Sequence, residues 1–284
     1  KPGIAFASKF VLQLSVVILG IQLSLAEAAK VGLQSLPVML GTLAICLVGA
    51  WLIGRALGVV GDLRTLIGVG TGICGASAIA ATAPVIGAVS VDVAYAVSTI
   101  FLFNIAAVLV FPLIGHLLGM SQTAFGLFAG TAVNDTSSVV AAASTYGAVA
   151  TNHAVVVKLV RTLMVIPIVV TLASWVPRRD ASAGADGAPR RLSVARVFRL
   201  VPWFLVGFVV MAAINSTGVI PAAAHDALTA VSLFLIATAL SAIGLSTDLT
   251  GFRRAGWRPL ALGGLLWIVV ALSSLGLQWA FGLL

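Results

Sequence analysis

Three charged side chains interrupt the apolar stretches of this chain: Asp135, Lys158 and Arg161. Lys158 and Arg161 are three residues apart, so on a helix they share one face. A charge on one face of an apolar helix is expected to point into the protein. There the two cations could form an ion pair with Asp135 that only neutralises buried charge, or they could bind an anion and balance its charge. Arginine suits a tetrahedral oxyanion through its forked donors, whereas lysine acts as a point charge.

Asp135 lies in a run of five polar residues, NDTSS at 134–138. Any of them could cap a helix N-terminus, and capping alone would explain Asp135. An ionisable group at membrane depth costs roughly 2.5–3.5 kcal/mol on insertion scales and is often functional. We therefore also assign Asp135 a coupling role, through protonation or cation binding, and expect it to be buried near Lys158 or Arg161. The candidate substrate contacts in this run are Asn134, Thr136 and Ser137.

A second cluster of small and polar residues lies about sixty residues earlier in the chain. Gly72 and Gly75 would let the backbone unwind there, and Ser77 would cap the helix that follows. A helix N-terminus presents free N–H groups and a partial positive charge, which suits an anion. The alternative is that these small residues only pack helices against one another. The candidate substrate contacts in this cluster are Thr71, Cys74, Gly75 and Ser77.

The two clusters belong to similar segments. Residues 70–88 read GTGICGASAIAATAPVIGA and residues 130–148 read GTAVNDTSSVVAAASTYGA, and at an offset of 60 they match at seven of nineteen positions. Unwound backbone at membrane depth is tolerated only where protein or trapped water satisfies it. The repeat therefore predicts two discontinuous helices, 62–90 and 122–149, that are interrupted near their middles and meet around a central cavity. They could cross the membrane or re-enter it as hairpins.

The rest of the chain has the composition of a membrane protein. Of its 284 residues, 61% are hydrophobic and 8% are charged, and the mean hydropathy is +1.17. A soluble domain carries roughly 25% charged residues. Apolar stretches near the ~20 residues that span a bilayer recur along the chain. The predicted spans are about 10–26, 35–57, 93–118, 153–176, 200–219, 227–247 and 259–282.

The net charge of +8 comes mainly from short basic loops, so these loops are expected to orient the protein in a membrane and not to bind nucleic acid. The positive-inside rule places them in the cytoplasm of a cell with an inner membrane. The basic loops are 177–199, 253–258 and the segment around Arg55 and Arg64. Asn104 is expected to form an interhelical hydrogen bond. The two cysteines lie in apolar segments and indicate neither a disulfide nor a zinc site. We expect no metal and no cofactor.

Three stretches of the sequence resemble the YeiH-type family of bacterial sulfate exporters: the segment at 70–88, GTAVNDTSSVVAAA at 130–143 and VVVKLVRTLMVIP at 155–167. The run LSAIGLST at 240–247 fits the late helix of that family. The chain departs from it at Asn134, where many members have a histidine, and in beginning about two helices later. The resemblance implies an elevator-like fold with a scaffold and a moving core, distantly related to bile-acid and other cation-coupled carriers. It also implies a sulfur oxyanion as the substrate class.

Together these features predict an all-α polytopic membrane protein, a single transmembrane domain over 1–284 of the inverted-repeat secondary-transporter type. The expected function is secondary active export of a small oxyanion such as sulfate or sulfite, coupled to protons or cations. An ion channel with re-entrant pore elements is the alternative. We expect no enzyme, because no second carboxylate, Ser/His/Asp set or metal-ligand set accompanies the three charged residues. The expected partners are the lipid bilayer, a small anion and, in a homodimer, a second copy of the chain.

Overall fold

Helices make up all of the regular secondary structure that is described. The computed structural model describes residues 2–175, 201–246 and 256–284, and these ranges contain no strand. Four apolar segments within them are long enough to cross a bilayer: α3 (Leu25–Ala56), α6 (Ser90–Leu117), α15 (Trp257–Ala280) and the segment Ala148–Ala173. The predicted all-helical membrane fold is confirmed at this level. The predicted loop 177–199 and residues 253–255 of the loop 253–258 lie outside the described residues.

The N-terminal span predicted over 10–26 is divided into short pieces. They are α1 (Pro2–Phe6), a π-helical turn (Ala7–Val11), α2 (Leu12–Leu19) and a 3-10 turn (Gly20–Gln22). The following helix, α3, begins well before the predicted residue 35 because Ser24 and Glu27 form a capping box. The Ser24 N–H donates to Glu27 Oε2 at 2.8 Å, and the Glu27 N–H donates to the Ser24 hydroxyl oxygen at 3.2 Å.

Both predicted discontinuous helices are interrupted. The first consists of α4 (Gly61–Gly72) and α5 (Ala76–Ile86), and the second of α7 (Gln122–Ala132) and α8 (Thr136–Tyr146). Residues 73–75 separate the first pair and residues 133–135 the second; we call them break 1 and break 2. In break 1, Gly75 has φ +68° and ψ −132°, a conformation that requires glycine. In break 2, Val133 and Asp135 are extended.

The two breaks lie against each other, and we call the place where they meet the crossing. A β-carbon added to Gly75 would lie 3.1 Å from Cβ and 3.3 Å from Cα of Asp135. Helix α9 (Ala148–Leu163) packs closely on α7, because Gly130 lets the backbones approach: a β-carbon there would lie 2.7 Å from Cβ of Val157. This packing directs the next residue of α9, Lys158, toward both breaks.

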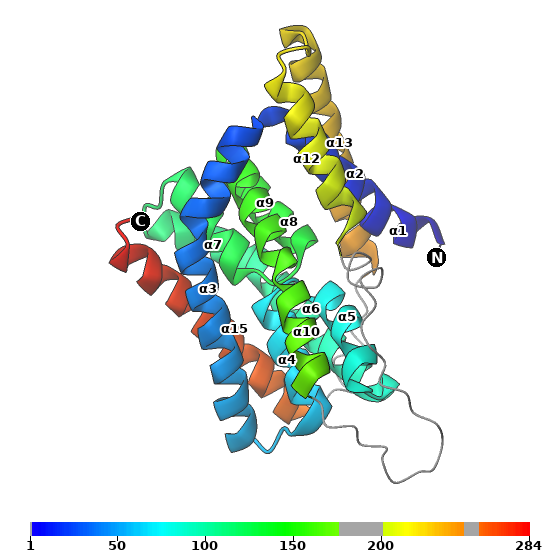
Figure 1. Ribbon diagram of the computed structural model, residues 1–284, viewed down its shortest axis with the longest axis vertical. Helices are drawn as coiled ribbons and strands as arrows, with labels where there is room; N and C mark the ends of the chain where they lie inside the picture. Colours follow the sequence, from blue (N-terminus) through cyan, green and yellow to red (C-terminus); the bar gives the residue numbers. More distant parts are fainter. Residues whose placement is uncertain (1, 176–200, 247–255) are drawn as a thin grey trace.

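The helices form two groups (Figure 1). Helices α1, α2, α12 (Trp203–Ser216) and α13 (Ala222–Ser246) lie together on one side, and α3 to α9, α10 (Val165–Trp175) and α15 form the other group. A shared apolar core joins the groups, in which Val16 and Phe208 belong to the first and Val156 and Leu159 to the second. Within the described residues the groups also share polar contacts. In one of these, the Asn152 side-chain amide donates to the Gln22 side-chain oxygen at 2.7 Å.

The C-terminal end of α3 and the N-terminal end of α15 lie at the same end of the molecule. A β-carbon on Gly58, which follows α3, would lie 3.4 Å from Nη1 of Arg258. At this end the Arg55 guanidinium lies 5.9 Å from the ring of Trp51, and the Arg258 guanidinium 5.7 Å from that of Trp257. Tryptophan and arginine are typical of the boundary between lipid and water, so these pairs indicate where the bilayer ends.

Replacing Gly75 by alanine is expected to destabilise the protein more than replacing Gly87, the glycine at the other end of α5. Gly87 lies in the left-handed α region (φ +70°, ψ +28°), where alanine costs about 1–2 kcal/mol, whereas Gly75 (φ +68°, ψ −132°) lies in a region that is essentially restricted to glycine, so the backbone strain there is larger. At Gly75 the new β-carbon would also press on Asp135, whereas at Gly87 it would meet nothing within 4 Å. Thermal unfolding in detergent should therefore show the larger drop in Tm for Gly75→Ala. Equal drops would contradict both the strained backbone at Gly75 and its close contact with Asp135.

Candidate functional site

Lys158 connects the two breaks. Its side chain is completely buried, and its Nζ donates to the carbonyl oxygens of Ile73 and Val133, at 2.8 Å in each case. These are equivalent positions of the repeat, sixty residues apart. They follow the C-terminal ends of α4 and α7, where the last carbonyls of a helix lack helical partners. A cation at this place also offsets the partial negative charge of both helix ends.

Arg161 also donates to a carbonyl at the C-terminal end of α4, but it uses only one of its three nitrogens. Its Nε donates to the carbonyl oxygen of Gly72 at 2.7 Å. Both terminal nitrogens, Nη1 and Nη2, are buried and have no hydrogen-bond partner among the described residues. Leaving such donors unpaired away from water costs free energy. Nη1 and Nη2 of Arg161 could therefore donate to a further hydrogen-bond acceptor at the crossing.

Asp135 caps α8. Its carboxylate accepts from the backbone N–H of Ser137 at 3.1 Å and from the hydroxyl of the same residue. The side chain is half-buried, whereas we expected it to be buried. No carboxylate in residues 2–175, 201–246 and 256–284 lies within 4.0 Å of a Lys158 or Arg161 nitrogen, so the ion pair considered above does not form. The backbone N–H and the hydroxyl of Ser137 hold the carboxylate, and backbone carbonyls hold the cations.

Asn104 of α6 holds break 2 from another direction. Its side-chain oxygen accepts from the backbone N–H groups of Asn134 and Asp135, at 3.2 Å in each case. These donors lie in extended backbone and would otherwise lack helical partners. The expected interhelical hydrogen bond is confirmed. Its role in the site was not predicted, although an isolated amide in an apolar span was the signal that could have found it.

The other candidate residues differ in burial. Asn134 is buried, and its Oδ1 has no partner among the described residues. Also buried are Thr71, Cys74 and Gly75, whereas Thr136 and Ser137 are half-buried and Ser77 is exposed. The prediction that Ser77 caps α5 is wrong. Gly75 occupies the N-cap position, and Ser77 lies inside the first turn, past the position from which a side chain caps.

The four half-helix ends at the crossing therefore differ. Cations occupy the carbonyl ends of α4 and α7, and Asp135 occupies the N-terminus of α8. The N-terminus of α5 has no side-chain cap, and its first residues, Ala76 and Ser77, are exposed. An uncapped N-terminus offers free N–H groups and partial positive charge. Two buried cations, one half-buried carboxylate and an open positive helix end form a set of groups suited to an anion.

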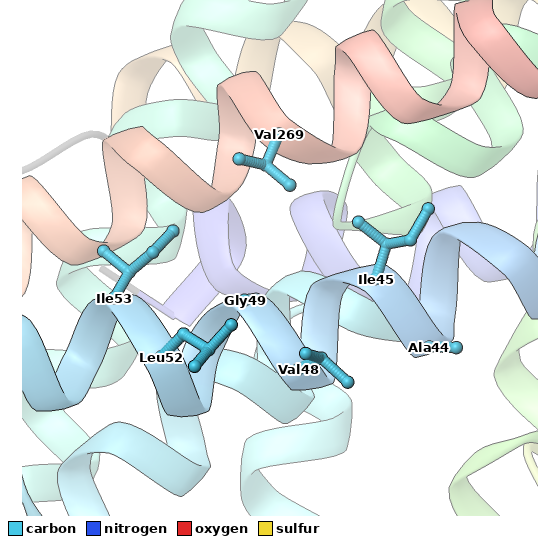
Figure 2. Close-up of a pocket in the computed structure, with 7 residues that line it drawn as sticks. All are labelled: Ala44, Ile45, Val48, Gly49, Leu52, Ile53 and Val269. Atoms are coloured by element: carbon cyan, nitrogen blue, oxygen red, sulfur yellow. The ribbon is translucent and has the colours of Figure 1, made fainter.

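The hollow drawn in Figure 2 lies away from the crossing. It is a groove between α3 and α15 in which every lining residue is apolar or glycine. Val48 and Leu52 are more than half exposed, at 56% and 53%, as lipid-facing side chains are. The lining residues are Ala44, Ile45, Val48, Gly49, Leu52, Ile53 and Val269. This groove has no side chain that could recognise an ion, and the central cavity expected at the breaks stays a prediction.

Membrane-length helices packed around two interrupted helices, with buried cations where these meet, define a polytopic membrane protein. The family model described as "Conserved hypothetical protein 698" matches residues 1–263. The chain therefore belongs to this family, whose relatives carry the name UPF0324 membrane protein.

The relatives align with the chain over nearly its whole length. The chain is 40% identical to a UPF0324 membrane protein of Streptococcus pyogenes serotype M3, over 100% of this chain and 84% of the relative. It is 42% identical to one from Streptococcus pneumoniae serotype 4 and 38% identical to one from Clostridium tetani, in both cases over 99% of this chain and 83% of the relative. No solved structure matches the chain. The names of these relatives state a membrane protein and no substrate.

Replacing Asp135 by asparagine should leave the stability of the protein nearly unchanged, whereas Asp135→Ala should lower it by about 0.5–2 kcal/mol. The reason is that asparagine caps a helix about as well as aspartate, and alanine offers no acceptor. Thermal unfolding of the purified variants measures the difference. Ser121→Ala is the matched control and should lose a similar amount, because Ser121 caps α7 by accepting from the Ala124 N–H at 3.2 Å. An asparagine variant as unstable as the alanine variant would show that the charge, and not the cap, matters here.

Proposed function

We propose that this protein is a secondary active transporter that exports a small oxyanion such as sulfate or sulfite. The observation that carries the proposal is the side chain of Arg161, fully buried with both terminal nitrogens unpaired within the described part of the chain. A bound oxyanion would accept from these donors in the two-pronged geometry that guanidinium groups favour. The resemblance to sulfate exporters supplies the direction and the substrate class.

The charge at the crossing also favours an anion. Lys158 and Arg161 contribute two buried cationic side chains, and Asp135 is the carboxylate that lies against break 1. Because Asp135 offsets at most one of these charges, at least one positive charge stays uncompensated by side chains. Helix-end carbonyls offset part of it. A buried charge without full compensation is costly, and a bound anion would supply the missing negative charge.

The arrangement of the two helix groups supports an elevator-like movement. They meet through an apolar core, whose contacts are not directional, and through polar contacts such as that of Asn152 with Gln22, which a shift of the groups would have to exchange. On one side of this contact, Lys158 fastens both breaks to α9. The crossing would therefore move as a unit, with α1, α2, α12 and α13 as the scaffold. Discontinuous half-helices around a central site are a recurrent feature of secondary transporters.

Reconstitution into liposomes tests this proposal against the ion-channel alternative. A transporter should exchange labelled for unlabelled sulfate or sulfite at a rate that saturates with concentration. A channel would instead pass large currents without obligatory exchange. Failure to exchange sulfate, sulfite, thiosulfate, taurine or carboxylates would reject the proposal. In the same vesicles Asp135→Asn tests the proposed coupling role: exchange should persist, but its dependence on a proton or cation gradient should be lost.

Substituting Arg161 by lysine should weaken anion binding at least about tenfold even though the charge is conserved. Lysine lacks the second donor nitrogen, and one hydrogen bond to a charged group contributes about 1.5–3 kcal/mol. Arg161→Ala should abolish binding. Calorimetry or an anion-dependent shift of Tm on folded variants measures the affinity. Arg55→Lys, at an exposed arginine near the end of α3, is the control and should bind like the wild type. Wild-type affinity in Arg161→Ala would place the site elsewhere and leave Arg161 a structural role.

A further inference from the structure

The acceptors of Lys158 are groups that could otherwise bind a metal cation. Where half-helices meet in secondary transporters, unwound backbone carbonyls and half-helix C-termini coordinate the coupling Na+. Here the corresponding oxygens belong to Ile73 and Val133, one in each break, and both accept from the same Nζ at 2.8 Å. The ammonium group of Lys158 thus lies where a free alkali ion would bind.

We propose that Lys158 is a built-in substitute for a coupling cation, so that the crossing binds no alkali ion and the protein works without a Na+ or K+ gradient. This inference rests on the proposed transport function and deepens it, because it removes alkali ions from the candidate coupling ions. It assigns Lys158 a role in ion specificity that is separate from the anion-binding role of Arg161.

Several oxygens at the crossing are already occupied by donors of the protein. Besides the two acceptors of Lys158, the carbonyl of Gly72 is occupied by Arg161. The side-chain oxygen of Asn104 is occupied by two backbone N–H groups. Among the buried side-chain oxygens there, Oδ1 of Asn134 has no hydrogen bond to the described residues. Hard cations take several oxygen ligands, so each oxygen that is already occupied leaves a free ion with a less complete shell.

The charge at the crossing and the covalent attachment of Lys158 to α9 both disfavour the binding of a free alkali ion. An additional cation would enter a region that already holds the charges of Lys158 and Arg161, both completely buried, with no carboxylate of the described residues paired to either. Lys158 is also attached to α9, so it reaches its carbonyls without the loss of translational freedom that a free ion incurs on binding. Moreover, a tethered cation cannot leave the site and therefore cannot be driven by a gradient.

The test is thermal unfolding of the purified full chain with Na+, K+ or Li+ replacing choline, at constant chloride so that anion effects at Arg161 stay equal. Wild type should have the same Tm in all four salts. Lys158→Met removes the charge and both hydrogen bonds but keeps an unbranched side chain, which leaves the two carbonyls open. This variant should be less stable in choline and should gain about 3 °C, saturably, in at least one alkali salt at about tenfold excess over its Kd. Lys30→Met, at an exposed lysine of α3, is the control and should behave like wild type.

An alkali-specific, saturable rise in the Tm of wild type would overturn the inference. A folded Lys158→Met with the same Tm in every salt would overturn it as well. Where Lys158→Met does not fold, Lys158→Gln, which can still donate to one carbonyl, is measured in the same way. If that variant also fails to fold, anion exchange is measured with wild-type protein in liposomes. A rate in choline equal to the rate in Na+ or K+ supports the inference, and a requirement for Na+ or K+ rejects it. The salt titration needs no transported anion, so failure of the proposed transport function would appear separately, as absent exchange.

Discussion

The hydrogen bonds from one ammonium group to two backbone carbonyls are the interaction on which the centre of this protein depends. A helix that stops inside a bilayer leaves carbonyls with neither a helical partner nor water, and each such group costs several kcal/mol in hydrocarbon. Lys158 satisfies Ile73 and Val133 together, and Arg161 satisfies Gly72. Both cations come from α9, which is held against α7 by the close approach at Gly130. The interruptions, the buried cations and this packing therefore stabilise one another.

The two breaks stand at equivalent positions of the repeat but differ in backbone conformation and in chemistry. At an offset of 60, Gly75 of break 1 corresponds to Asp135 of break 2, and these two residues lie against each other in the structure. Break 1 depends on a backbone conformation that glycine alone adopts readily. Break 2 has no such residue and depends on side chains, since Asn104 accepts from its N–H groups and Asp135 caps the next helix. The repeat thus interrupts both helices at equivalent positions while making one half-helix N-terminus open and the other capped.

The sequence was sufficient to predict the position of both breaks, because glycine and hydroxyl residues in an apolar span directly reflect where a helix unwinds. It could not identify the partners of Lys158, because those are backbone carbonyls, and Ile73 and Val133 are by residue type ordinary apolar residues. Helical spacing correctly gave Lys158 and Arg161 a common face, but a shared face does not identify what lies opposite it. The cap of α5 was misassigned for a related reason: a serine is visible in the sequence, whereas the positive φ of Gly75 is not. The division of 10–26 into short helical pieces was also missed, since hydropathy does not distinguish them from one continuous span.

The arginine–tryptophan pairs give α3 and α15 a shared end of the kind found at a lipid–water boundary. Helix α3 has 32 residues, about 48 Å at 1.5 Å per residue, and so exceeds the ~30 Å hydrocarbon core. Arg55 with Trp51, and the corresponding pair on α15, fix one end at the lipid–water boundary. At the other end of α3 the N–H of Leu25 donates to the Ser216 hydroxyl of α12 at 2.8 Å. Because α12 belongs to the other helix group, a change in the tilt of α3 would be transmitted to the contact between the two groups.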